Sequence, residues 1–598
     1  MDTARFESSH PQGRGWRVTL ERPRALHTAH DLDSVRAVLA QADAAARDGL
    51  WAAVTVSYDA APAFEPALRG IGRQPGVPLA SVCVFERASR EPRETHPPRA
   101  GIPAASPAAL VLNPAISGER FVAGVQDAQR HIRDGDAYQV NLTFPLTGPA
   151  PPDPKRLFER LLDAQQAPYC AHIHDGRHEI LSFSPELFFE RRGPHLTTRP
   201  MKGTATRGRW QAEDTAAATR LRDSPKDRAE NVMIVDLLRN DLGRVARVGS
   251  VHATELFAIE RYPTLWQMTS TVEADVGDEV CLADLFGALF PCGSVTGAPK
   301  IRTMEIIAAL EATPRGLYTG AIGFVEPGGD CTFSVAIRTL VIDHDTATIS
   351  MGVGAGITTD SVAEEEYQEC LLKGRFATEP PAWTVTSGSP PWSLLETMRL
   401  EDGRVARLDG HLDRMRASAG YFGIPWEDER VRATIESETL AHQAGCWRLR
   451  LQVDRAGVPH AHAAPFDAPA HPRRWRVALA PQPVDANDPR LFNKTTDRRV
   501  YDAARAAHPA MDDVLLWNAR GEITESTIAN LVAELDGERV TPPVACGLLP
   551  GVLRSELVGQ GALRERVITR ADLVRASRLW LVNSLRGWIE ATIEWTAL

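Results

Sequence analysis

Apolar residues recur at two different spacings along the first two thirds of the chain. They follow the helical period over 226–242 and 362–377, which predicts two amphipathic helices. Short runs of β-branched and aromatic residues at 187–190, 319–325 and 333–342 predict strands. This part of the chain is therefore predicted to be mixed α and β.

The pattern breaks at 378–391, where Pro, Ser, Thr and Gly replace the periodic apolar positions. A chain of 598 residues is also too long for one ordinary hydrophobic core. We therefore predict two domains, at 1–377 and 393–598, joined by a linker at 378–392.

The last third of the chain is also predicted to contain both helices and strands, with a helix over 410–420 and strands over 446–453 and 474–480. The composition of 43% hydrophobic and 24% charged residues is typical of a globular protein. A net charge of -10 and a pI near 6.0 give no general attraction to nucleic acid or to anionic membranes. Any anionic ligand must therefore be held by local positive groups.

The cysteines and the amino terminus indicate the cytoplasm. The eight cysteines are scattered singly, without a CxxC pair or the dense spacing of disulfide-stapled secreted domains. The first residues lack the apolar segment of a signal peptide, and no apolar run approaches the roughly 20 residues that span a bilayer. We expect a cytoplasmic protein that binds neither membranes nor nucleic acid.

Lysine is rare here: only six of the 67 basic residues are lysine, at positions 155, 202, 226, 300, 373 and 494. Since arginine is the default surface cation, each lysine is a candidate for chemistry that an always protonated guanidinium cannot perform. Glu186 and Lys202 lie beside Gly and Pro turns, where side chains can point into a cleft. A lysine in an apolar setting there can have a lowered pKa and act as a nucleophile. An ordinary turn lysine is the alternative.

Two predicted helices each carry a pair of carboxylates three residues apart. Asp227 and Glu230 project from one helix face, and Glu366 and Glu369 repeat the arrangement with Lys373 one turn further on. Brought together, the two faces would form a hard oxygen site suited to Mg²⁺. From the spacing alone, two solvated helix faces are the favoured interpretation.

Two glycine-rich segments, 290–302 and 351–361, could bring backbone N–H groups close to carboxylate oxygens. Neither is a nucleotide motif. The first lacks GxxxxGK[ST], and the second has Ile357 where GxGxxG requires its last glycine. A nucleotide site is therefore excluded.

Residues 115–377 resemble the chorismate-utilising family shared by anthranilate synthase and component I of aminodeoxychorismate synthase. The motifs that carry the resemblance are GlyAspAlaTyrGlnValAsnLeuThr (135–143), SerProGlu (184–186), LysGlyThr (202–204), AspLeuLeuArgAsnAsp (236–241), GlyAlaProLys (297–300) and GlyAlaGlyIle (354–357). The resemblance implies chorismate as the substrate. It also implies an α+β chorismate-utilising fold, with packed β-sheets surrounded by helices.

Two positions select the branch of the family. Isochorismate-forming and salicylate-forming relatives use a lysine to activate water where this chain has Gln139, so hydration at C2 is disfavoured. Anthranilate synthases carry a small residue where this chain has Lys202. In the aminodeoxychorismate branch this lysine attacks C2 of chorismate as the C4 hydroxyl leaves, and ammonia then enters at C4. The resemblance thus implies amination at C4.

The same resemblance implies roles for the other residues. Glu186 would be the general acid for the departing hydroxyl, and Arg338 and Tyr318 would hold a substrate carboxylate. Glu230 and Glu369 would bind Mg²⁺, with Asp227 and Glu366 as supporting ligands. The other implied substrate-binding positions are Thr204, Gly354, Gly356 and Lys373. One departure is that Trp266 and Gln267 stand where many relatives have histidine.

The last lysine, Lys494, lies upstream of an acid, Glu525, and of a loop at 547–554 whose following helix could bind phosphate through backbone N–H groups. A turn cation and an exposed acid are the alternative for this pair. From LeuGluThrMetArg (395–399) through HisLeuAspArgMet (411–415) to AsnSerLeuArgGly (583–587), the segment resembles the fold type IV pyridoxal phosphate enzymes.

That resemblance implies a second domain of two α/β subdomains with pyridoxal 5'-phosphate as cofactor. Lys494 would be the Schiff-base lysine and proton shuttle, and Glu525 the partner of the pyridine nitrogen. Arg414, the N–H groups of Val552 and Leu553, and the hydroxyl of Ser584 would hold the phosphate. A homodimer is suggested because such relatives usually dimerise. The chain lacks the longer lead that precedes the GluThr segment in this family.

The fusion of the two domains predicts the synthesis of 4-aminobenzoate, a folate precursor, by amination of chorismate and then elimination of pyruvate. No GxCxGxQ-like nucleophile elbow is present, so ammonia would come from solution or from a separate glutamine amidotransferase subunit. One alternative is an anthranilate-type component I fused to an aminotransferase. Another is a second domain that is catalytically silent and serves for docking.

Overall fold

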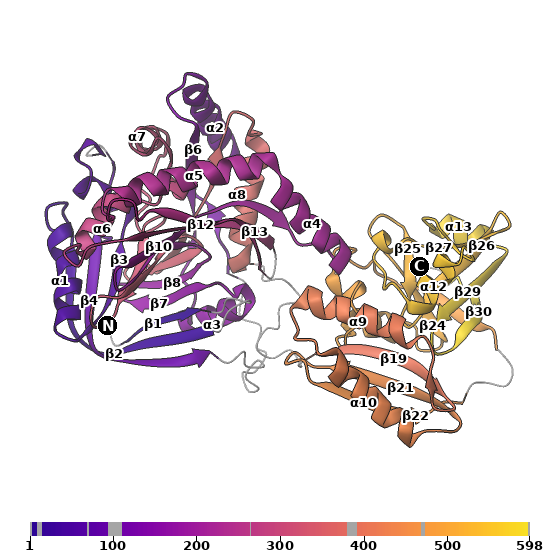
Figure 1. Ribbon diagram of the computed structural model, residues 1–598. Coiled ribbons are helices and arrows are strands. Elements are labelled where there is room, and N and C mark those ends of the chain that lie inside the picture. Colours follow the sequence, from indigo (N-terminus) through magenta and orange to yellow (C-terminus); the bar gives the residue numbers. More distant parts are fainter. Residues whose placement is uncertain are drawn as a thin grey trace. The chain divides into compact units, whose positions relative to one another are not determined.

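The computed structural model describes residues 3–8, 15–68, 71–93, 110–262, 265–378, 392–467 and 473–595. Its chain divides into two compact units, Met1–Arg207 with Ala217–Ser389, and Gly208–Ala216 with Pro390–Leu598 (Figure 1). Nearly all of the predicted linker at 378–392 lies outside the described residues. Among the helices that the structure describes, none combines the length and the apolar character that crossing a membrane requires.

The first unit is built on antiparallel strands. They are β1 (Thr3–Ser8), β2 (Gly15–Ala29), β3 (Trp51–Val56), β4 (Ala80–Arg93), β5 (Asn113–Pro114), β6 (Gln139–Pro149), β7 (Tyr169–His174), β8 (His178–Ser184), β9 (Leu187–Arg192), β10 (His195–Arg199), β11 (Met201–Thr206), β12 (His252–Arg261), β13 (Leu265–Asp275), β14 (Gly297–Ala298), β15 (Ala321–Val325), β16 (Cys331–Val335), β17 (Thr339–Asp343) and β18 (Thr348–Ile357). Hydrogen bonds connect all of them into one continuous system.

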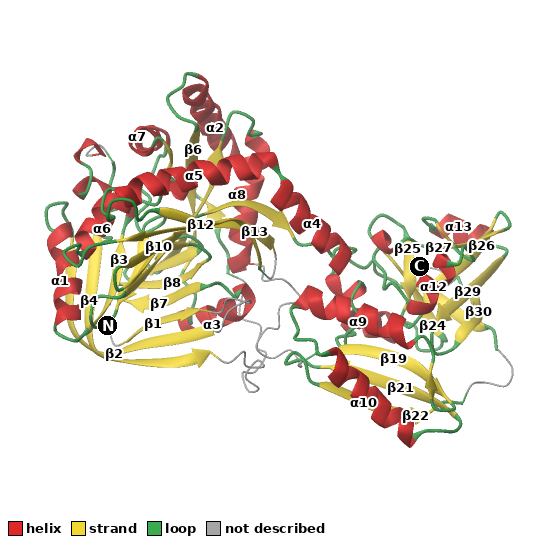
Figure 2. Ribbon diagram, viewed as in Figure 1, coloured by secondary structure: helices red, strands yellow, loops and turns green. Residues whose placement is uncertain are grey.

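Helices flank these strands, as Figure 2 shows by colour. They are α1 (Val35–Arg47), α2 (Gly118–Arg133), α3 (Pro154–Gln165), α5 (Pro225–Gly243), α6 (Leu282–Leu289), α7 (Lys300–Leu310) and α8 (Ala363–Thr378), while α4 (Gln211–Asp223) spans a boundary between the units. The long helix α5 packs on β11 and β13, and α8 packs on β18. These contacts bring α5 and α8 to strands that carry the predicted chorismate residues.

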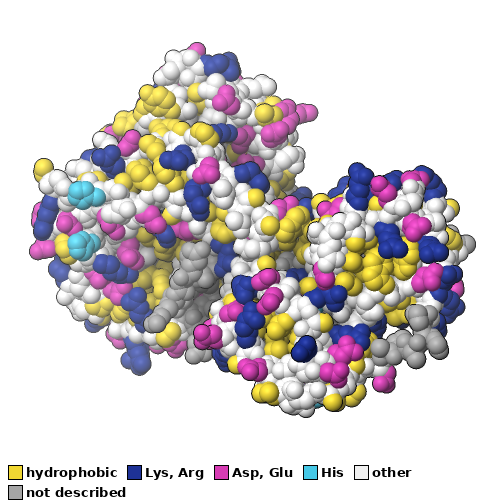
Figure 3. Space-filling model, turned by 45° about the vertical axis from the view of Figure 1, so that its right-hand side comes forward, with side chains coloured by type: hydrophobic (Ala, Val, Ile, Leu, Met, Phe, Trp, Pro, Cys, Tyr) yellow, Lys and Arg dark blue, Asp and Glu magenta, His cyan; other side chains and the backbone are white. Residues whose placement is uncertain are grey.

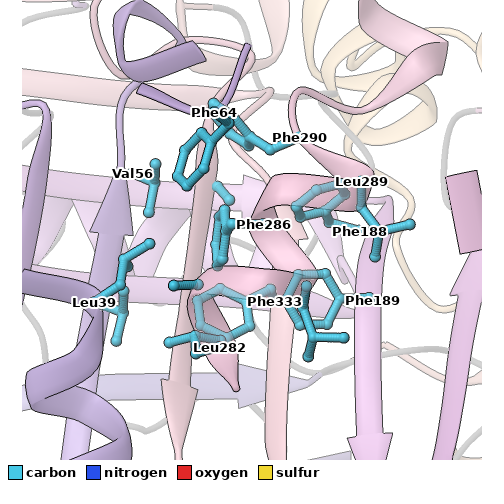
Figure 4. Packing of buried hydrophobic residues seen from close by; sticks show 14 of the residues in the cluster. Leu39, Val56, Phe64, Phe188, Phe189, Leu282, Phe286, Leu289, Phe290 and Phe333 are labelled. Carbon is cyan, nitrogen blue, oxygen red and sulfur yellow. The ribbon is translucent and has the colours of Figure 1, made fainter. Parts of the chain in front are cut away.

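The described residues of this unit form three apolar cores. One lies between strands, where Phe6 and Phe324 pack with ring centroids 4.9 Å apart. The other two lie between strands and helices, one under α1, α5 and α6 and the other under α2, α3, α7 and α8. In the core under α1, α5 and α6, the ring of Phe286 packs edge to face against the rings of Phe188 and Phe333 (Figure 4). The arrangement agrees with the expected packed sheets surrounded by helices.

The predicted strand at 333–342 is two strands. β16 ends at Val335 and β17 begins at Thr339, and Arg338 between them has a φ of 49°, in the left-handed region. β16 pairs with β9 and β15, whereas β17 pairs with β8 and β18. The hydrophobic run therefore changes its partners at Arg338.

The second unit contains two sheets. The smaller is antiparallel and comprises β19 (Leu394–Glu401), β20 (Arg404–Val405), β21 (Cys446–Val453) and β22 (Pro459–Pro465). The larger is mixed and comprises β23 (Trp475–Leu479), β24 (Asp513–Trp517), β25 (Ile523–Ser526), β26 (Asn530–Leu535), β27 (Glu538–Thr541), β28 (Arg564–Glu565), β29 (Arg578–Asn583) and β30 (Gly587–Ile593). This agrees with the expected two α/β subdomains.

Among the described residues after 391, the helices that accompany these sheets are α9 (Leu408–Phe422), α10 (Asp428–Ala441), α11 (Arg499–Ala507), α12 (Val552–Gly559) and α13 (Arg570–Arg575). Leu449 and Leu451 of β21 are fully buried in a core with residues of α9 and α10. The opposite face of the small sheet is therefore free to line a cavity.

Candidate active sites

Glu186 lies in the short connection between β8 and β9 and is 2% exposed. Burial raises the pKa of its carboxyl to about 7, against the opposing effects of the Ser294 hydroxyl, the Lys202 ammonium and the Met201 N–H group. The sulfur of Cys292 lies 3.9 Å from its Oε1. Near neutral pH this carboxyl is therefore partly protonated and can donate a proton.

Lys202 is on β11, and burial lowers the pKa of its ammonium, while the charges of Glu230 and Glu186 oppose that shift. A Cβ atom added to Gly356 would lie 3.3 Å from Lys202 Nζ and 2.5 Å from Gln139 Nε2. The amine and the amide thus converge on Gly356, where a side chain would displace them. A lowered pKa increases the fraction of Lys202 that is present as the free amine, the form that acts as a nucleophile.

Glycines of β18 make room for the surrounding groups. A Cβ atom on Gly352 would meet the ring of Tyr318 at 2.1 Å, and one on Gly354 would meet the methyl of Thr143 at 2.6 Å. The carbonyl of Gly354 accepts a hydrogen bond of 2.9 Å from Lys373 Nζ. The strand therefore presents backbone, rather than side chains, beside Tyr318 and Lys373.

Arg338 carries a positive charge without an acidic partner. Its guanidinium makes no hydrogen bond or ion pair with any residue in the described ranges. Burial lowers its pKa. An unpaired, poorly solvated guanidinium favours the binding of an anion such as a carboxylate.

The predicted metal ligands come from two helices. Glu230 on α5 is close enough to interact with Lys202, and Lys226 on the same helix interacts with Glu366 on α8. Burial raises the pKa of Glu366. Within the described part of the chain, no three His, Cys, Asp or Glu side chains are grouped closely enough to hold a metal ion. Mg²⁺ nevertheless usually binds to only one or two protein carboxylates and completes its coordination with water and an anionic substrate. Carboxylates from the two helices therefore suit this ion.

The other predicted ligands have local contacts. The carboxylate of Glu369 forms an ion pair of 2.8 Å with Lys373. Asp227 packs against Gly203, because a Cβ atom added to that glycine would lie 3.0 Å from the Asp227 Cβ. Asp227 is therefore beside the strand that carries Lys202.

Gln267 has a clear structural role that the sequence did not reveal. It is 6% exposed, its Nε2 donates to the carbonyl of Gly203 at 2.8 Å, and its Oε1 accepts from the Thr204 hydroxyl at 3.1 Å. These bonds fix the residues directly after Lys202. Lys300, by contrast, is paired with Asp241 at 2.6 Å.

The second unit encloses a cavity of about 330 Å³, within the usual size range of ligand sites. Five of the predicted cofactor residues line it: Arg414, Lys494, Glu525, Val552 and Ser584. Leu553 follows Val552 in α12, and its own side chain is buried in an apolar cluster. The cavity therefore collects residues that are far apart in the sequence.

Lys494 is anchored by its backbone. Its carbonyl accepts a hydrogen bond of 2.9 Å from the N–H of Leu395, at the start of β19. Burial and the charge of Arg414 lower the pKa of the ammonium to about 8. This favours the free amine that an aldehyde cofactor requires.

Glu525 is buried, and three groups hold its carboxylate. Oε1 accepts from the Tyr501 hydroxyl at 2.9 Å and from the N–H of Leu549 at 3.1 Å, and Oε2 accepts from Asn530 Nδ2 at 3.2 Å. Burial raises its pKa to about 8. A fixed acid in the same cavity as an amine fits a pyridine-containing cofactor.

Glu396 and His411 belong to this site but were not singled out from the sequence. The buried carboxylate of Glu396 accepts two bonds from Arg414, at 2.8 and 2.6 Å, and lies 2.7 Å from Nδ1 of His411. Although burial alone would raise its pKa, Arg414 and His411 lower it to about 2. His411 also lines the cavity, and its buried Nε2 has no hydrogen-bond partner in the described structure. Such an atom fits a polar ligand.

Replacing Glu396 by glutamine is expected to lower the free energy of unfolding of the second unit by roughly 3 kcal/mol at pH 7. Because the folded pKa of about 2 is below the ordinary 4.5, the charge stabilises the fold fully above about pH 4.5. That stabilisation disappears as the pH falls towards 2. Urea unfolding of the cofactor-free chain should therefore show a difference from the wild type that shrinks at low pH.

Glu401→Gln is the matched control on the same strand. Glu401 is an exposed residue that pairs with Arg399, so its loss is expected to cost less than about 0.5 kcal/mol. Equal unfolding free energies for Glu396→Gln and the wild type at pH 7 would contradict the stabilising role of the buried network.

Comparison with known proteins gives each unit a match. Residues 5–379 match the family model described as chorismate binding enzyme, and residues 393–593 match the model described as amino-transferase class IV. The first unit also resembles the crystal structure of anthranilate synthase component I from Streptococcus pneumoniae TIGR4. That similarity has a TM-score of 0.54 and 26% identity, and it covers 62% of this chain and 93% of the other.

Two curated relatives match the first unit equally well. Aminodeoxychorismate synthase component 1 of Bacillus subtilis is 42% identical over 253 residues, which are 42% of this chain and 53% of the relative. Anthranilate synthase component 1 1 of Haloarcula marismortui is 42% identical over 257 residues, which are 43% of this chain and 52% of the relative. The chain thus spans about half the length of these relatives. Because one family model covers residues 5–379, the chain belongs to the chorismate binding enzyme family.

Proposed function

We propose that the chain makes 4-aminobenzoate in two steps. In the first unit, chorismate and ammonia give 4-amino-4-deoxychorismate and water. In the second unit, this product is split into 4-aminobenzoate and pyruvate. The observation that carries the proposal is Lys202, an amine whose pKa is lowered by burial and which interacts with the buried acid Glu186. Overall similarity does not select the branch, since both kinds of relative are 42% identical.

In the first reaction, Lys202 Nζ forms a bond to C2 of chorismate while the bond from C4 to its hydroxyl breaks. Glu186 supplies the proton with which that hydroxyl leaves as water. Ammonia then bonds to C4 as the bond from C2 to Lys202 breaks and restores the amine, and the proton that the new ammonium group gives up returns to Glu186. Gln139, whose amide faces Gly356 beside Lys202, has no basic group with which to activate water.

Substrate binding is proposed to use the fixed positive groups of the unit. Arg338 and Tyr318 would hold one carboxylate of chorismate, with Thr204, Lys373 and the backbone of Gly354 and Gly356 as further contacts. Glu230 and Glu369 would hold Mg²⁺, supported by Asp227 and Glu366. The metal ion would neutralise a substrate carboxylate that these acids would otherwise repel.

The value of kcat/KM for amination, measured at a constant concentration of free ammonia, is expected to fall as the pH rises from 6 to 8. The pKa of Glu186 is about 7, so its proton-donating form disappears as the pH rises. Lys202 has the opposite dependence, because its free amine increases with pH. The residual activity of Glu186→Gln should lack the falling limb. A wild-type limb that persists in this variant would contradict the role of Glu186.

In the second reaction, Lys494 is proposed to hold the cofactor and to move the proton at ring C4 of the substrate. Glu525 would face the pyridine nitrogen, and Arg414, Val552, Leu553 and Ser584 would hold the phosphate. Two N–H groups of Arg414 remain available, because Glu396 and the carbonyl of Pro550 accept the other three. When bound, pyridoxal 5'-phosphate supplies an electron sink for the elimination.

The partners and the location follow from the same proposal. Ammonia would come from solution or from a separate glutamine amidotransferase subunit, and the product would serve folate synthesis in the cytoplasm. Basic and acidic side chains are interspersed on the face that Figure 3 shows, in keeping with local rather than general anion binding. We also propose the domain limits 1–377 and 393–598, and a homodimer.

Product identification tests this function. The purified chain is incubated with chorismate, ammonium, Mg²⁺ and pyridoxal 5'-phosphate, and the products are separated by chromatography. The expected products are 4-aminobenzoate and pyruvate in equal amounts. Formation of 2-aminobenzoate would instead support an anthranilate-type enzyme, a candidate that the similarity to anthranilate synthase component 1 keeps open.

A further inference from the structure

The cavity of the second unit contains more positive charge than its acids neutralise. Among its lining residues, Arg414 and Arg490 are held in ion pairs with carboxylates. Arg448, Arg450 and Arg586 also line the cavity, but their guanidinium groups form no hydrogen bond or ion pair with any residue that the structure describes. The guanidinium of Arg586 also lies over the rings of Phe466 and Trp475, at 5.5 and 5.9 Å from their centroids, and these contacts leave its N–H groups unused. The N–H groups of all three arginines are therefore available to a ligand.

Strand geometry directs two of them into the cavity. Residues of β21 alternate between its two faces, and Leu449 and Leu451 are buried in the core beneath α9 and α10. Arg448 and Arg450 therefore project from the opposite face. Thr397 of β19 is directly paired with Arg450 and also lines the cavity. This face of the small sheet is thus one wall of the cavity.

The third arginine comes from the larger sheet. Arg586 lies in the turn between β29 and β30, where its backbone N–H donates to Asn583 Oδ1 at 2.8 Å. Burial and the charge of Arg448 lower the pKa of Arg586, and the smaller opposing effect of the Asp513 charge does not offset them. The two guanidinium groups are therefore close enough to repel each other. A bound anion would relieve that repulsion.

We propose that Arg448, Arg450 and Arg586 form an anion subsite that binds the two carboxylates of a dicarboxylic substrate. This rests on the proposed function, in which the cavity receives a ring compound with two carboxylates. A guanidinium fork matches a carboxylate bidentately, and three forks exceed what the single carboxylate of an ordinary amino acid can use. The subsite therefore selects for dicarboxylates over monocarboxylates.

The binding of two inert probes tests the subsite. The full-length, cofactor-loaded chain is titrated with benzene-1,3-dicarboxylate and with benzoate, and the absorbance of the bound cofactor reports binding. We expect the dicarboxylate to bind at least about tenfold more tightly than benzoate. Arg448→Gln and Arg586→Gln should each weaken the binding of the dicarboxylate by roughly 10–100-fold. The binding of benzoate should be weakened less. Arg404→Gln, an exposed arginine of the same sheet outside the cavity lining, is the matched control.

Further measurements separate a substrate subsite from a role in cofactor binding and from a general effect of charge. The dissociation constant of the cofactor should be the same in all variants, because a loss of cofactor binding would assign these arginines to its phosphate and overturn the proposal. Equal affinities of the two probes would also overturn it. Arg448→Lys and Arg586→Lys keep the positive charge but lose the forked geometry of the guanidinium. Their affinity for the dicarboxylate should lie between those of the wild type and the glutamine variants. Selective dicarboxylate binding without conversion of 4-amino-4-deoxychorismate would support the subsite and refute the proposed reaction.

Discussion

Lys202→Ala is expected to lower the rate of C4 amination by on the order of 10³-fold or more, because the variant lacks the proposed nucleophile. The lysine bonds to C2 while the C4 hydroxyl departs, so its loss removes the step that opens C4 to ammonia. Neither Gln139 nor Lys373 can replace it. The amide is not nucleophilic, and Lys373 is held by Gly354 and Glu369.

The assay supplies chorismate, ammonium and Mg²⁺ in excess and measures 4-amino-4-deoxychorismate directly. Lys155→Ala is the matched control, since Lys155 is exposed on α3 and should leave the rate unchanged. The Lys202→Ala variant should also release C2 for direct attack, so trace product should shift towards the 2-amino isomer. A 4-amination rate within a few-fold of wild type would remove Lys202 from the chemistry.

Local patterns in the sequence were sufficient for many elements of the fold. The predicted helices at 226–242 and 362–377 are α5 and α8, and the predicted strand at 446–453 is β21. These segments have a sustained period and buried partners on one face, so their conformation agrees with their own sequence. The turn at Arg338 was missed because 333–342 is an uninterrupted β-type run, and only its changing partners reveal the turn.

Some site residues were predicted from an unusual residue type, and others, such as Arg338 and Arg414, from the family resemblances. Lys202 and Lys494 were found because lysine is rare, and the structure shows that burial lowers the pKa of both. Glu396 and Gln267 were missed because their roles depend on partners from other elements. Arg448 and Arg450 were missed for another reason: in an amphipathic strand, polar residues at alternate positions look like an ordinary solvent-exposed face.

Lys494→Ala is expected to stop the second step and leave the first intact, so the chain should accumulate 4-amino-4-deoxychorismate. The proposed proton transfer at ring C4 needs an amine beside the substrate, and no second lysine lies in the second unit. Among the cavity-lining residues, Glu525 is already held by Tyr501 and Asn530. We therefore expect pyruvate release to fall by on the order of 10³-fold or more.

The measurement follows both products over time and includes the cofactor spectrum. Wild-type protein should absorb at roughly 400–430 nm with the cofactor bound, and Lys494→Ala should lose this band while keeping its amination rate. Arg404→Ala, at an exposed position outside the cavity lining, controls for nonspecific loss of charge. Unchanged pyruvate release in Lys494→Ala would favour a docking role for the second unit. Loss of both steps would mean that the units depend on each other, since Lys202 and Lys494 belong to different compact units.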